Sequence, residues 1–288
     1  MQIQTFSIVT GSGACDARCP FCVSRMTGEA KAKPIPPNWR NFDIACKLAM
    51  QAGATTAMLT GKGEPTLWPE LIGEYLDCLQ GYPIPIVELQ TNGLNIARGK
   101  VKDETLVDWY DKGLSTIAIS VASIDGVENS KIYTPGKTYP DLIPTIEKLH
   151  RIGFGVRLIC VLCKWFTDSC EKVNSLISYA KENNIEQLTL LPVSKPDNSS
   201  NTAVSEWVEE HTLSRGELRE IHKWLEFNGM VVLELPHGAK VYDVFGQNVC
   251  MNNCLDPKPT SNDQMRNLIY FPDGRIRHRW DAEGSIIL

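Results

Sequence analysis

The chain of 288 residues lacks several features that define whole classes of protein. It contains no apolar run approaching the roughly 18 residues of a membrane span, and no basic stretch followed by an apolar one, as secretory signals have. It also contains no low-complexity tract and no repeat of fixed period. We therefore expect a globular, cytoplasmic protein without a membrane partner.

The chain also lacks an excess of positive charge. It carries 29 Lys and Arg residues against 34 Asp and Glu residues, which gives a formal net charge of -5. Extended contact with nucleic acid needs many cationic groups on phosphates, so this charge disfavours such a partner. A hydrophobic content of 43% suits one large α/β domain, or a domain with an extension.

Cysteine, in contrast, is abundant and clustered, and three of the ten cysteines lie within eight residues. Cys15, Cys19 and Cys22 follow the apolar segment Ile3–Val9. Without a signal peptide, clustered cysteines indicate metal binding in a reducing compartment, and thiolates are the ligands that iron-sulfur clusters and zinc prefer. No fourth cysteine is near, which leaves one metal position open for chemistry. The alternative is a zinc site that takes its fourth ligand from a distant His or Cys.

Strand-like and helix-like patterns alternate along most of the chain. The expected strands are 3–9, 56–60, 86–90, 116–121, 155–161 and 187–192, and the expected helices are 38–51, 69–79, 103–112, 141–151, 167–182 and 214–227. Six such units predict an α/β fold with a parallel sheet and helices packed outside it. The periodicity fits both a partial barrel and an open sheet.

The pattern changes from about Met230. A short strand over 231–235 and a loop carrying Cys250 and Cys254 precede a hairpin, in which 268–271 and 275–280 flank the turn Pro272–Gly274. This organisation predicts two domains, a barrel over 1–229 and a C-terminal β-hairpin cap over 230–288 that contacts the substrate.

The spacing C-x3-C-x2-C, with Phe21 directly before the last cysteine, resembles the signature loop of the radical S-adenosylmethionine (radical SAM) superfamily. The resemblance implies a partial (β/α)6 TIM-like barrel. It further implies a 4Fe-4S cluster held by Cys15, Cys19 and Cys22, with S-adenosyl-L-methionine (SAM) chelating the remaining iron. In that family, one electron from the cluster cleaves SAM to a 5'-deoxyadenosyl radical, which removes a hydrogen atom from the substrate.

A second motif lies at the end of the second expected strand. The run Gly61-Lys-Gly-Glu-Pro65 resembles the Gly-Gly-Glu-Pro motif of the same family, with Lys62 in place of the first glycine of the pair. The resemblance implies that Gly61, Gly63 and Glu64 hold the amino group of SAM. The alternative is a tight turn between a strand and a helix.

Further candidates for cofactor binding follow the other strands, because functional residues of parallel α/β folds gather at the carboxyl ends of the strands. Asn92 lies in a Thr-Asn-Gly run that is similar to one in the family, and Asn-Gly is equally a turn signal. Ser120 is a candidate for the ribose hydroxyls, and Phe21 belongs to the same cofactor-binding group. Arg157, in an apolar strand, needs an anion, either the methionyl carboxylate of SAM or a structural Asp or Glu.

The remaining cysteines are weaker candidates. Cys250 and Cys254 in the cap, with Cys160 and Cys163 near the fifth strand, could complete an auxiliary metal site of the kind found in the molybdopterin precursor cyclase and in peptide-modifying relatives. The hairpin of this chain has no cysteine, so the cap pair is alternatively a remnant or a disulfide.

Three arginines alternate with other residues in the expected last strand. Arg275, Arg277 and Arg279 would share one face of that strand and form a positive stripe. Facing the barrel mouth, the stripe could bind a phosphate or carboxylate of the substrate, with Arg266, Lys240 and His237 as accessories. Facing solvent, it would be a solubilising edge.

The leading hypothesis is a radical SAM enzyme that abstracts a hydrogen atom from a small, anionic, nucleotide-like substrate and receives electrons from a donor such as a flavodoxin or ferredoxin. An alternative substrate is a ribosomally made peptide, which would need a groove and an exposed sheet edge in the cap. A second alternative is a zinc or iron-sulfur binding module without catalysis.

Overall fold

The fold is built on one sheet of eleven strands in the order β11-β10-β1-β2-β3-β4-β5-β6-β9-β8-β7. The computed structural model describes residues 2–27, 31–196, 199–235, 237–252, 264–280, 282 and 284–288. The strands are β1 (Gln2–Val9), β2 (Thr56–Thr60), β3 (Ile86–Thr91), β4 (Thr116–Val121), β5 (Gly155–Leu162), β6 (Gln187–Pro192), β7 (Gly229–Glu234), β8 (Lys240–Val244), β9 (Gln247–Met251), β10 (Gln264–Tyr270) and β11 (Ile276–Arg277). Strands β1 to β6 are parallel and adjacent in sequence order.

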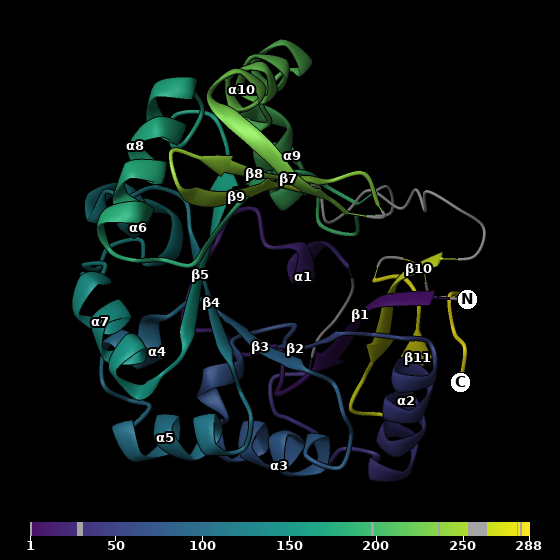
Figure 1. Ribbon diagram of the computed structural model, residues 1–288. Coiled ribbons are helices and arrows are strands. Elements are labelled where there is room, and N and C mark those ends of the chain that lie inside the picture. Colours follow the sequence, from purple (N-terminus) through teal and green to yellow (C-terminus); the bar gives the residue numbers. More distant parts are fainter. Residues whose placement is uncertain are drawn as a thin grey trace.

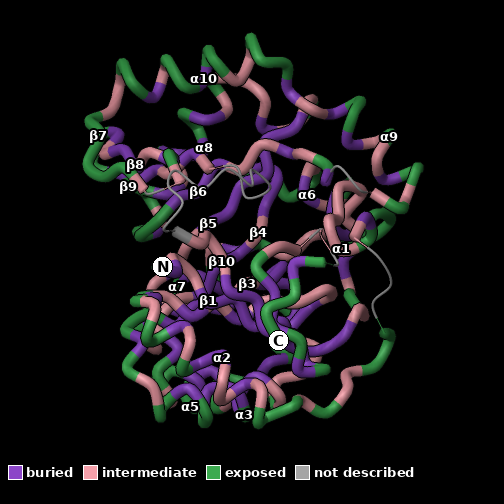
Figure 2. Tube along the Cα trace, turned by 90° about the vertical axis from the view of Figure 1, so that its right-hand side faces the viewer, coloured by how far each residue is buried: buried purple, intermediate pink, exposed green. Residues whose placement is uncertain are grey.

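Helices cover the outer face of the curved sheet, whereas the short helix α1 lies inside the curve (Figure 1). The α-helices are α1 (Val23–Met26), α2 (Trp39–Gln51), α3 (Pro69–Leu79), α4 (Leu94–Ala97), α5 (Asp103–Asp111), α6 (Gly126–Tyr133), α7 (Ile143–Ile152), α8 (Cys170–Glu182), α9 (Thr202–His211) and α10 (Arg215–Asn228). The trace is buried mainly along the sheet and exposed along the outer surfaces of helices such as α5 and α10 (Figure 2). This arrangement confirms the α/β fold with a parallel sheet.

Alternation along the strands separates the two faces of the sheet. On β5, Val156 and Leu158 belong to the main hydrophobic core under the helices, whereas Arg157 and Ile159 point to the inner face. The same alternation places Glu88 of β3 and Ser120 of β4 on the inner face, between residues of the main core. The inner face is therefore more polar than the layers of branched side chains that usually fill a closed (β/α)8 barrel.

Aromatic packing holds α2 against the first strands. Phe42 of α2 lies 5.0 Å from Tyr270 of β10 and 5.1 Å from Tyr75 of α3, measured between ring centroids, and it stacks on Phe6 of β1 at 6.1 Å. The side chain of Asn38 begins α2 by accepting a hydrogen bond from the backbone of Asn41. These contacts fix the β1–α2 unit that precedes the second strand.

The sheet does not close into a full barrel, because its two ends, β11 and β7, are not paired. Strand β10 extends the sheet beside β1, and β9 extends it beside β6, both in parallel. Side chains bridge the opening between these edges. His237 hydrogen-bonds with Gln4 of β1 at 3.0 Å and with Asn252 at 3.2 Å, and Arg266 of β10 donates to the same Asn252 oxygen at 2.9 Å. The partial barrel that the family resemblance implied is thus confirmed.

The C-terminal part differs from its expected form. Cys250 lies on β9, in a three-stranded antiparallel extension, instead of in a loop. The expected strand 275–280 is regular only over Ile276–Arg277. The end of the chain lies beside it, and the Ile276 amide donates to the Leu288 carbonyl at 2.8 Å. Strands of both expected domains share one sheet, and the division at residue 229 stays a prediction.

No helix in the described part of the chain combines the length and the apolar character needed to cross a membrane.

Replacing Phe42 by Ala should lower the free energy of unfolding by about 3–5 kcal/mol, because the change leaves a cavity among four aromatic rings. Denaturant unfolding of the apoprotein measures the change. Phe227→Ala is the matched control, since that side chain is 89% exposed and should change stability little. Equal effects of the two substitutions would contradict the packing described for α2.

Candidate functional site

The three clustered cysteines lie on the loop between β1 and α1, at the carboxyl end of the parallel strands. Cys22 is the residue before the first turn of α1, and its amide donates to the Cys19 carbonyl at 3.3 Å. Each thiol lies close enough to the others for their negative charges to interact. Among the described residues, no three His, Cys, Asp or Glu side chains converge on a single metal ion.

Burial makes two of these thiols weaker acids. It is the largest cause that raises the pKa of Cys15 to about 12; the backbone amide of Ala17 opposes the rise, and the nearby carboxylates of Glu64 and Asp16 add to it. Burial and the two neighbouring thiols also raise the pKa of Cys19. A cationic iron-sulfur cluster would reverse this balance, because metal binding releases the protons of its ligands. Three adjacent thiols on one loop fit the ligand set of such a cluster.

The carboxylate of Glu64 connects the loop after β2 to the end of β3. This carboxylate is fully buried and accepts hydrogen bonds from the Thr66 amide at 3.0 Å, from the hydroxyls of Thr66 and Thr91 at 2.6 Å each, and from the Asn92 amide at 2.8 Å. Burial raises the pKa of Glu64, and these hydrogen bonds oppose that shift. Glu64 thus fixes the loop after β2 against the end of β3 by hydrogen bonds within the protein. Its expected contact with the SAM amino group stays a prediction.

Asn92 connects the end of β3 to the cysteine loop. Its side-chain amide donates to Asp16 at 2.9 Å and to the Cys15 sulfur at 3.8 Å, while its oxygen accepts from the Leu94 amide. Asp16 is also held by Arg98 at 3.7 Å. Asn92 is therefore a turn residue and a neighbour of a cysteine thiol, and its expected role in cofactor binding stays a prediction.

The loop after β2 and the cysteine loop touch through their backbones. The Glu64 amide donates to the Ala14 carbonyl at 2.9 Å. A Cβ atom added to Gly63 would lie 2.0 Å from the Ala14 carbonyl oxygen, and one added to Gly61 would lie 3.1 Å from the Thr10 carbonyl oxygen. No side chain fits at position 63, so the glycine there is required by the approach of the two loops.

An aromatic wall lines one side of the cysteine loop. Phe21 packs against Tyr133 at 6.3 Å and against Trp207 of α9 at 5.8 Å between ring centroids, and Trp207 stacks on His211 at 3.6 Å. Neither Tyr133 nor Trp207 was identified from the sequence, since isolated aromatic residues carry no spacing signal. The structure places Phe21 between these residues instead of leaving it in solvent.

Arg157 has a carboxylate partner on the inner face of the sheet. Its guanidinium donates to Glu88 of β3 at 2.6 Å, and Gln90 donates to the same carboxylate oxygen at 3.3 Å. This partner is the structural acid that the sequence left open as an alternative to the methionyl carboxylate. Ser120, on the neighbouring strand, is partly buried on the same face.

The three described candidates for an auxiliary metal site are not brought together. Cys160 lies in the main core, Cys163 lies in a second cluster with Met26, and Cys250 lies near Arg157 and Arg266. Alternation along β5 separates the first two, because residues three apart point to opposite faces of a strand. Cys254 lies outside the described residues. The auxiliary site stays a prediction that this arrangement does not favour.

The three arginines of the expected stripe have different environments. Arg275 pairs with Asp273 at 2.5 Å and is half-exposed, whereas Arg277 is only 9% exposed. Arg279 lies beyond the end of β11. The guanidinium groups of Arg275 and Arg277 lie 5.9 Å and 5.2 Å from the centre of the Phe271 ring, and the full stripe stays a prediction.

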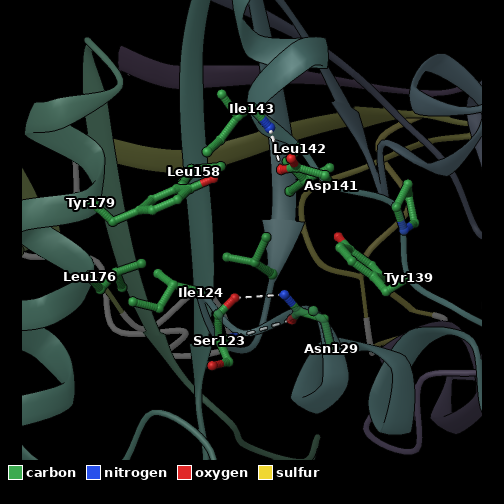
Figure 3. Close-up of a pocket in the computed structure, with 13 residues that line it drawn as sticks. Ser123, Ile124, Asn129, Tyr139, Asp141, Leu142, Ile143, Leu158, Leu176 and Tyr179 are labelled. Carbon is green, nitrogen blue, oxygen red and sulfur yellow. Dashed lines mark hydrogen bonds between the residues drawn. The ribbon is translucent and has the colours of Figure 1, made fainter.

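A cavity of about 270 Å³ lies outside the cysteine site, between the end of β4 and helices α6 to α8 (Figure 3). Its lining residues are Val121, Ser123, Ile124, Gly126, Asn129, Tyr139, Pro140, Asp141, Leu142, Ile143, Leu158, Leu176 and Tyr179. The Asn129 side chain holds its rim by donating to the Ser123 carbonyl at 2.6 Å. No candidate site residue lines this cavity.

Comparison with known proteins gives consistent matches. The pattern described as the Radical SAM superfamily matches residues 9–177. A GTP 3',8-cyclase of Aquifex aeolicus (strain VF5) is 26% identical over 159 residues, which cover 54% of this chain and 46% of that protein. The chain therefore spans about half the length of this curated relative.

Two solved structures of SuiB from Streptococcus suis share the fold. The structure bound to S-adenosylmethionine has a TM-score of 0.65 at 17% identity, and the structure bound to the precursor peptide SuiA has a TM-score of 0.58 at 16% identity. Each match covers 96% of this chain and 60% of SuiB.

Replacing Gly63 by Ala should force the two loops apart, because the new methyl group would overlap the Ala14 carbonyl. We expect a loss of about 1–3 kcal/mol of stability and a lower iron and sulfide content after anaerobic reconstitution. Gly126→Ala is the control, since an added Cβ there meets nothing within 4 Å. Normal iron and sulfide content in the Gly63 variant would show that the loop contact is dispensable.

Proposed function

This chain belongs to the radical SAM superfamily, and from that premise we propose that it is an enzyme that cleaves SAM reductively and abstracts a hydrogen atom from its substrate. Radical SAM enzymes use a 4Fe-4S cluster and SAM, which together supply a 5'-deoxyadenosyl radical when bound. The proposed partners are a substrate and an electron donor such as a flavodoxin or ferredoxin. Its proposed location is the cytoplasm.

The residues of the chain have separable tasks in this proposal. Cys15, Cys19 and Cys22 hold the cluster. Glu64 and Asn92 fix the position of the cysteine loop, because their hydrogen bonds join it to the ends of β2 and β3. Gly61 and Gly63 let the loop after β2 pack directly against the backbone of the segment that leads into the cysteine loop.

The remaining candidates surround this centre. Phe21 and the aromatic wall exclude water from one side, which protects a reactive radical from solvent. Ser120 is kept as a candidate for hydrogen bonding to the ribose of SAM. Arg157 is kept as a weaker candidate for the methionyl carboxylate, because Glu88 already neutralises it.

The observation that carries the proposal is the contact between Asn92 and Cys15. It links the cysteine motif and the Gly-Lys-Gly-Glu-Pro motif, which lie far apart in the sequence, through one buried carboxylate. A zinc or iron-sulfur module without catalysis would need the thiols, but it would not need a second ordered loop beside them.

The Cys19→Ala variant should lose the cluster and all release of 5'-deoxyadenosine. The wild-type chain should contain iron and sulfide after anaerobic reconstitution, and it should release 5'-deoxyadenosine when SAM and dithionite are added. Cys78→Ala serves as the control, because this exposed cysteine lies on α3 away from the loop.

Two results would contradict the proposal. Wild-type protein that holds zinc and no sulfide would indicate a structural metal site. Full release of 5'-deoxyadenosine by the Cys19 variant would show that the cluster ligands were wrongly chosen.

We further propose a small, anionic, nucleotide-like substrate. Cationic side chains lie on the inner face of the sheet and beside the opening between β9 and β10, although the whole chain has a net charge of -5. They include Arg157, Arg266 and Arg277. The similarity to a GTP 3',8-cyclase supports the same substrate class.

A peptide substrate is the second candidate, and the edge strand β7 favours it. Met230, Val231, Val232 and Leu233 are 45–66% exposed, and within the described strands β7 pairs only on its β8 side. Such an edge can accept a peptide strand. A bound peptide would slow amide hydrogen exchange along β7, whereas a small anion would leave that exchange unchanged.

A further inference from the structure

Arg277 is a buried cation on the inner side of the sheet. In the antiparallel pair of β10 and β11, Arg277 lies opposite Ile269, and Ile276 lies opposite Tyr270. Directly opposed residues share a face of the sheet. Tyr270 and Ile276 belong to the main core under the helices, whereas Ile269 packs with Val9 in a separate cluster. The side chain of Arg277 therefore points to the inner face, like that of Ile269.

No acidic side chain within the described residues forms an ion pair with Arg277. Its Nε atom is buried without a hydrogen-bond partner, and its guanidinium carbon lies 5.2 Å from the centre of the Phe271 ring. The nearby carboxylate of Asp273 is bound by Arg275 at 2.5 Å. A buried guanidinium without an anion is unfavourable, and Phe271 compensates only a part of the lost hydration.

A second cation lies on the neighbouring loop, two residues after the end of β2. Thr60 at that end pairs with Val9, and Val9 packs against Ile269, the residue opposite Arg277. Lys62 occupies the position where the family motif has glycine, and its ammonium group donates to the Thr27 carbonyl at 2.9 Å. Burial lowers the pKa of Lys62, and the positive charges of Arg277 and Arg275 lower it further. An ammonium group has three donors, so this bond leaves two of them available for a ligand.

We propose that Lys62 and Arg277 form an anion-binding subsite that holds a phosphate or carboxylate group of the substrate. The planar guanidinium of Arg277 would bind two oxygens of the anion, and Lys62 would bind another as a point charge. This subsite lies on the inner face beside the loop that carries the cysteines, because Lys62 belongs to the loop that contacts Ala14. The assignment rests on the proposed function, since it names the substrate class of the same site.

The subsite also explains the departure from the Gly-Gly-Glu-Pro motif. A side chain at position 62 meets Thr27, just after α1, whereas no side chain fits at position 63. Lys62 is thus the position of this loop from which a cation reaches toward β11. Arg277 also differs from the other two arginines of the expected stripe. Among the described residues, it is the one of the three that combines burial with an unpartnered Nε.

Binding of inorganic pyrophosphate to the reconstituted protein tests the subsite without turnover. Titration calorimetry should show binding by the wild-type chain that weakens roughly 10- to 100-fold in Arg277→Gln and in Lys62→Met, because each loses a charge-assisted hydrogen bond. Arg275→Gln removes the same charge from the neighbouring, half-exposed arginine, and it should weaken binding less than about fivefold. Arg277→Lys keeps the positive charge but loses the planar guanidinium that binds two oxygens. This variant replaces Arg277→Gln in the test if Arg277→Gln fails to fold.

The subsite would be overturned if the wild-type chain did not bind pyrophosphate, or if all variants bound it equally well. It would also be overturned if Arg275→Gln weakened binding as much as Arg277→Gln, because that result would indicate a diffuse positive field. SAM titrations identify the source of the anion. Weaker SAM binding in Arg277→Gln and Lys62→Met, with competition between SAM and pyrophosphate, would assign the subsite to the cofactor carboxylate and overturn the substrate assignment. Release of 5'-deoxyadenosine without substrate tests the proposed function separately, because that reaction does not need the subsite.

Discussion

The buried carboxylate of Glu64 is the interaction on which the geometry of the site depends. Parallel strands bring their loops to one edge of a sheet, but they do not fix how the loops lie against one another. Here one carboxylate accepts hydrogen bonds from the loop after β2 and from the end of β3, and the amide of the same residue is bound to the cysteine loop. Three consecutive strands thus position the thiols through a single residue, and the glycine beside it permits the close approach.

The inner face of the sheet shows a distribution of charge that the composition conceals. The chain is acidic overall, yet its inner face and seam carry Arg157, Arg266, Arg277 and the nearby Lys62. Glu88 neutralises Arg157, and Asn252 accepts from Arg266. The net charge of a protein therefore affects its association with large polyanions. It does not determine which small ligand binds in a recessed site, because the local charges there decide that.

Sequence patterns predicted the six strand-helix units, because apolar runs and helical spacing are local signals. They missed α1, α4, α6 and α9 and the β8–β9 hairpin. Asp125 caps the start of α6 by accepting from the Val127 amide, and Asn129 within the helix accepts from the Ala122 and Ser123 amides, a contact that spacing does not reveal. The partial barrel itself followed from the family resemblance, since periodicity alone does not choose between a barrel and an open sheet.

The same limit applies to the site. The cysteine spacing pointed to the loop that we propose as the cluster site, but Thr91 and Glu88, the partners of Glu64 and Arg157, lie on β3, where only the fold brings them near. The stripe of arginines expected from alternation stays a prediction, because only Arg277 of the three lies on the regular part of β11.

The two edges of the sheet have a common origin in the sequence. Strands β7 to β9 form one border of the opening and β10 and β11 form the other, and all five come after Asn228, whereas the three clustered cysteines lie before residue 23. A recombination event near that boundary would exchange both borders at once and leave the cysteine loop intact. Variation confined to the last fifth of the chain could therefore reshape the entrance to the sheet while the first loop keeps its sequence.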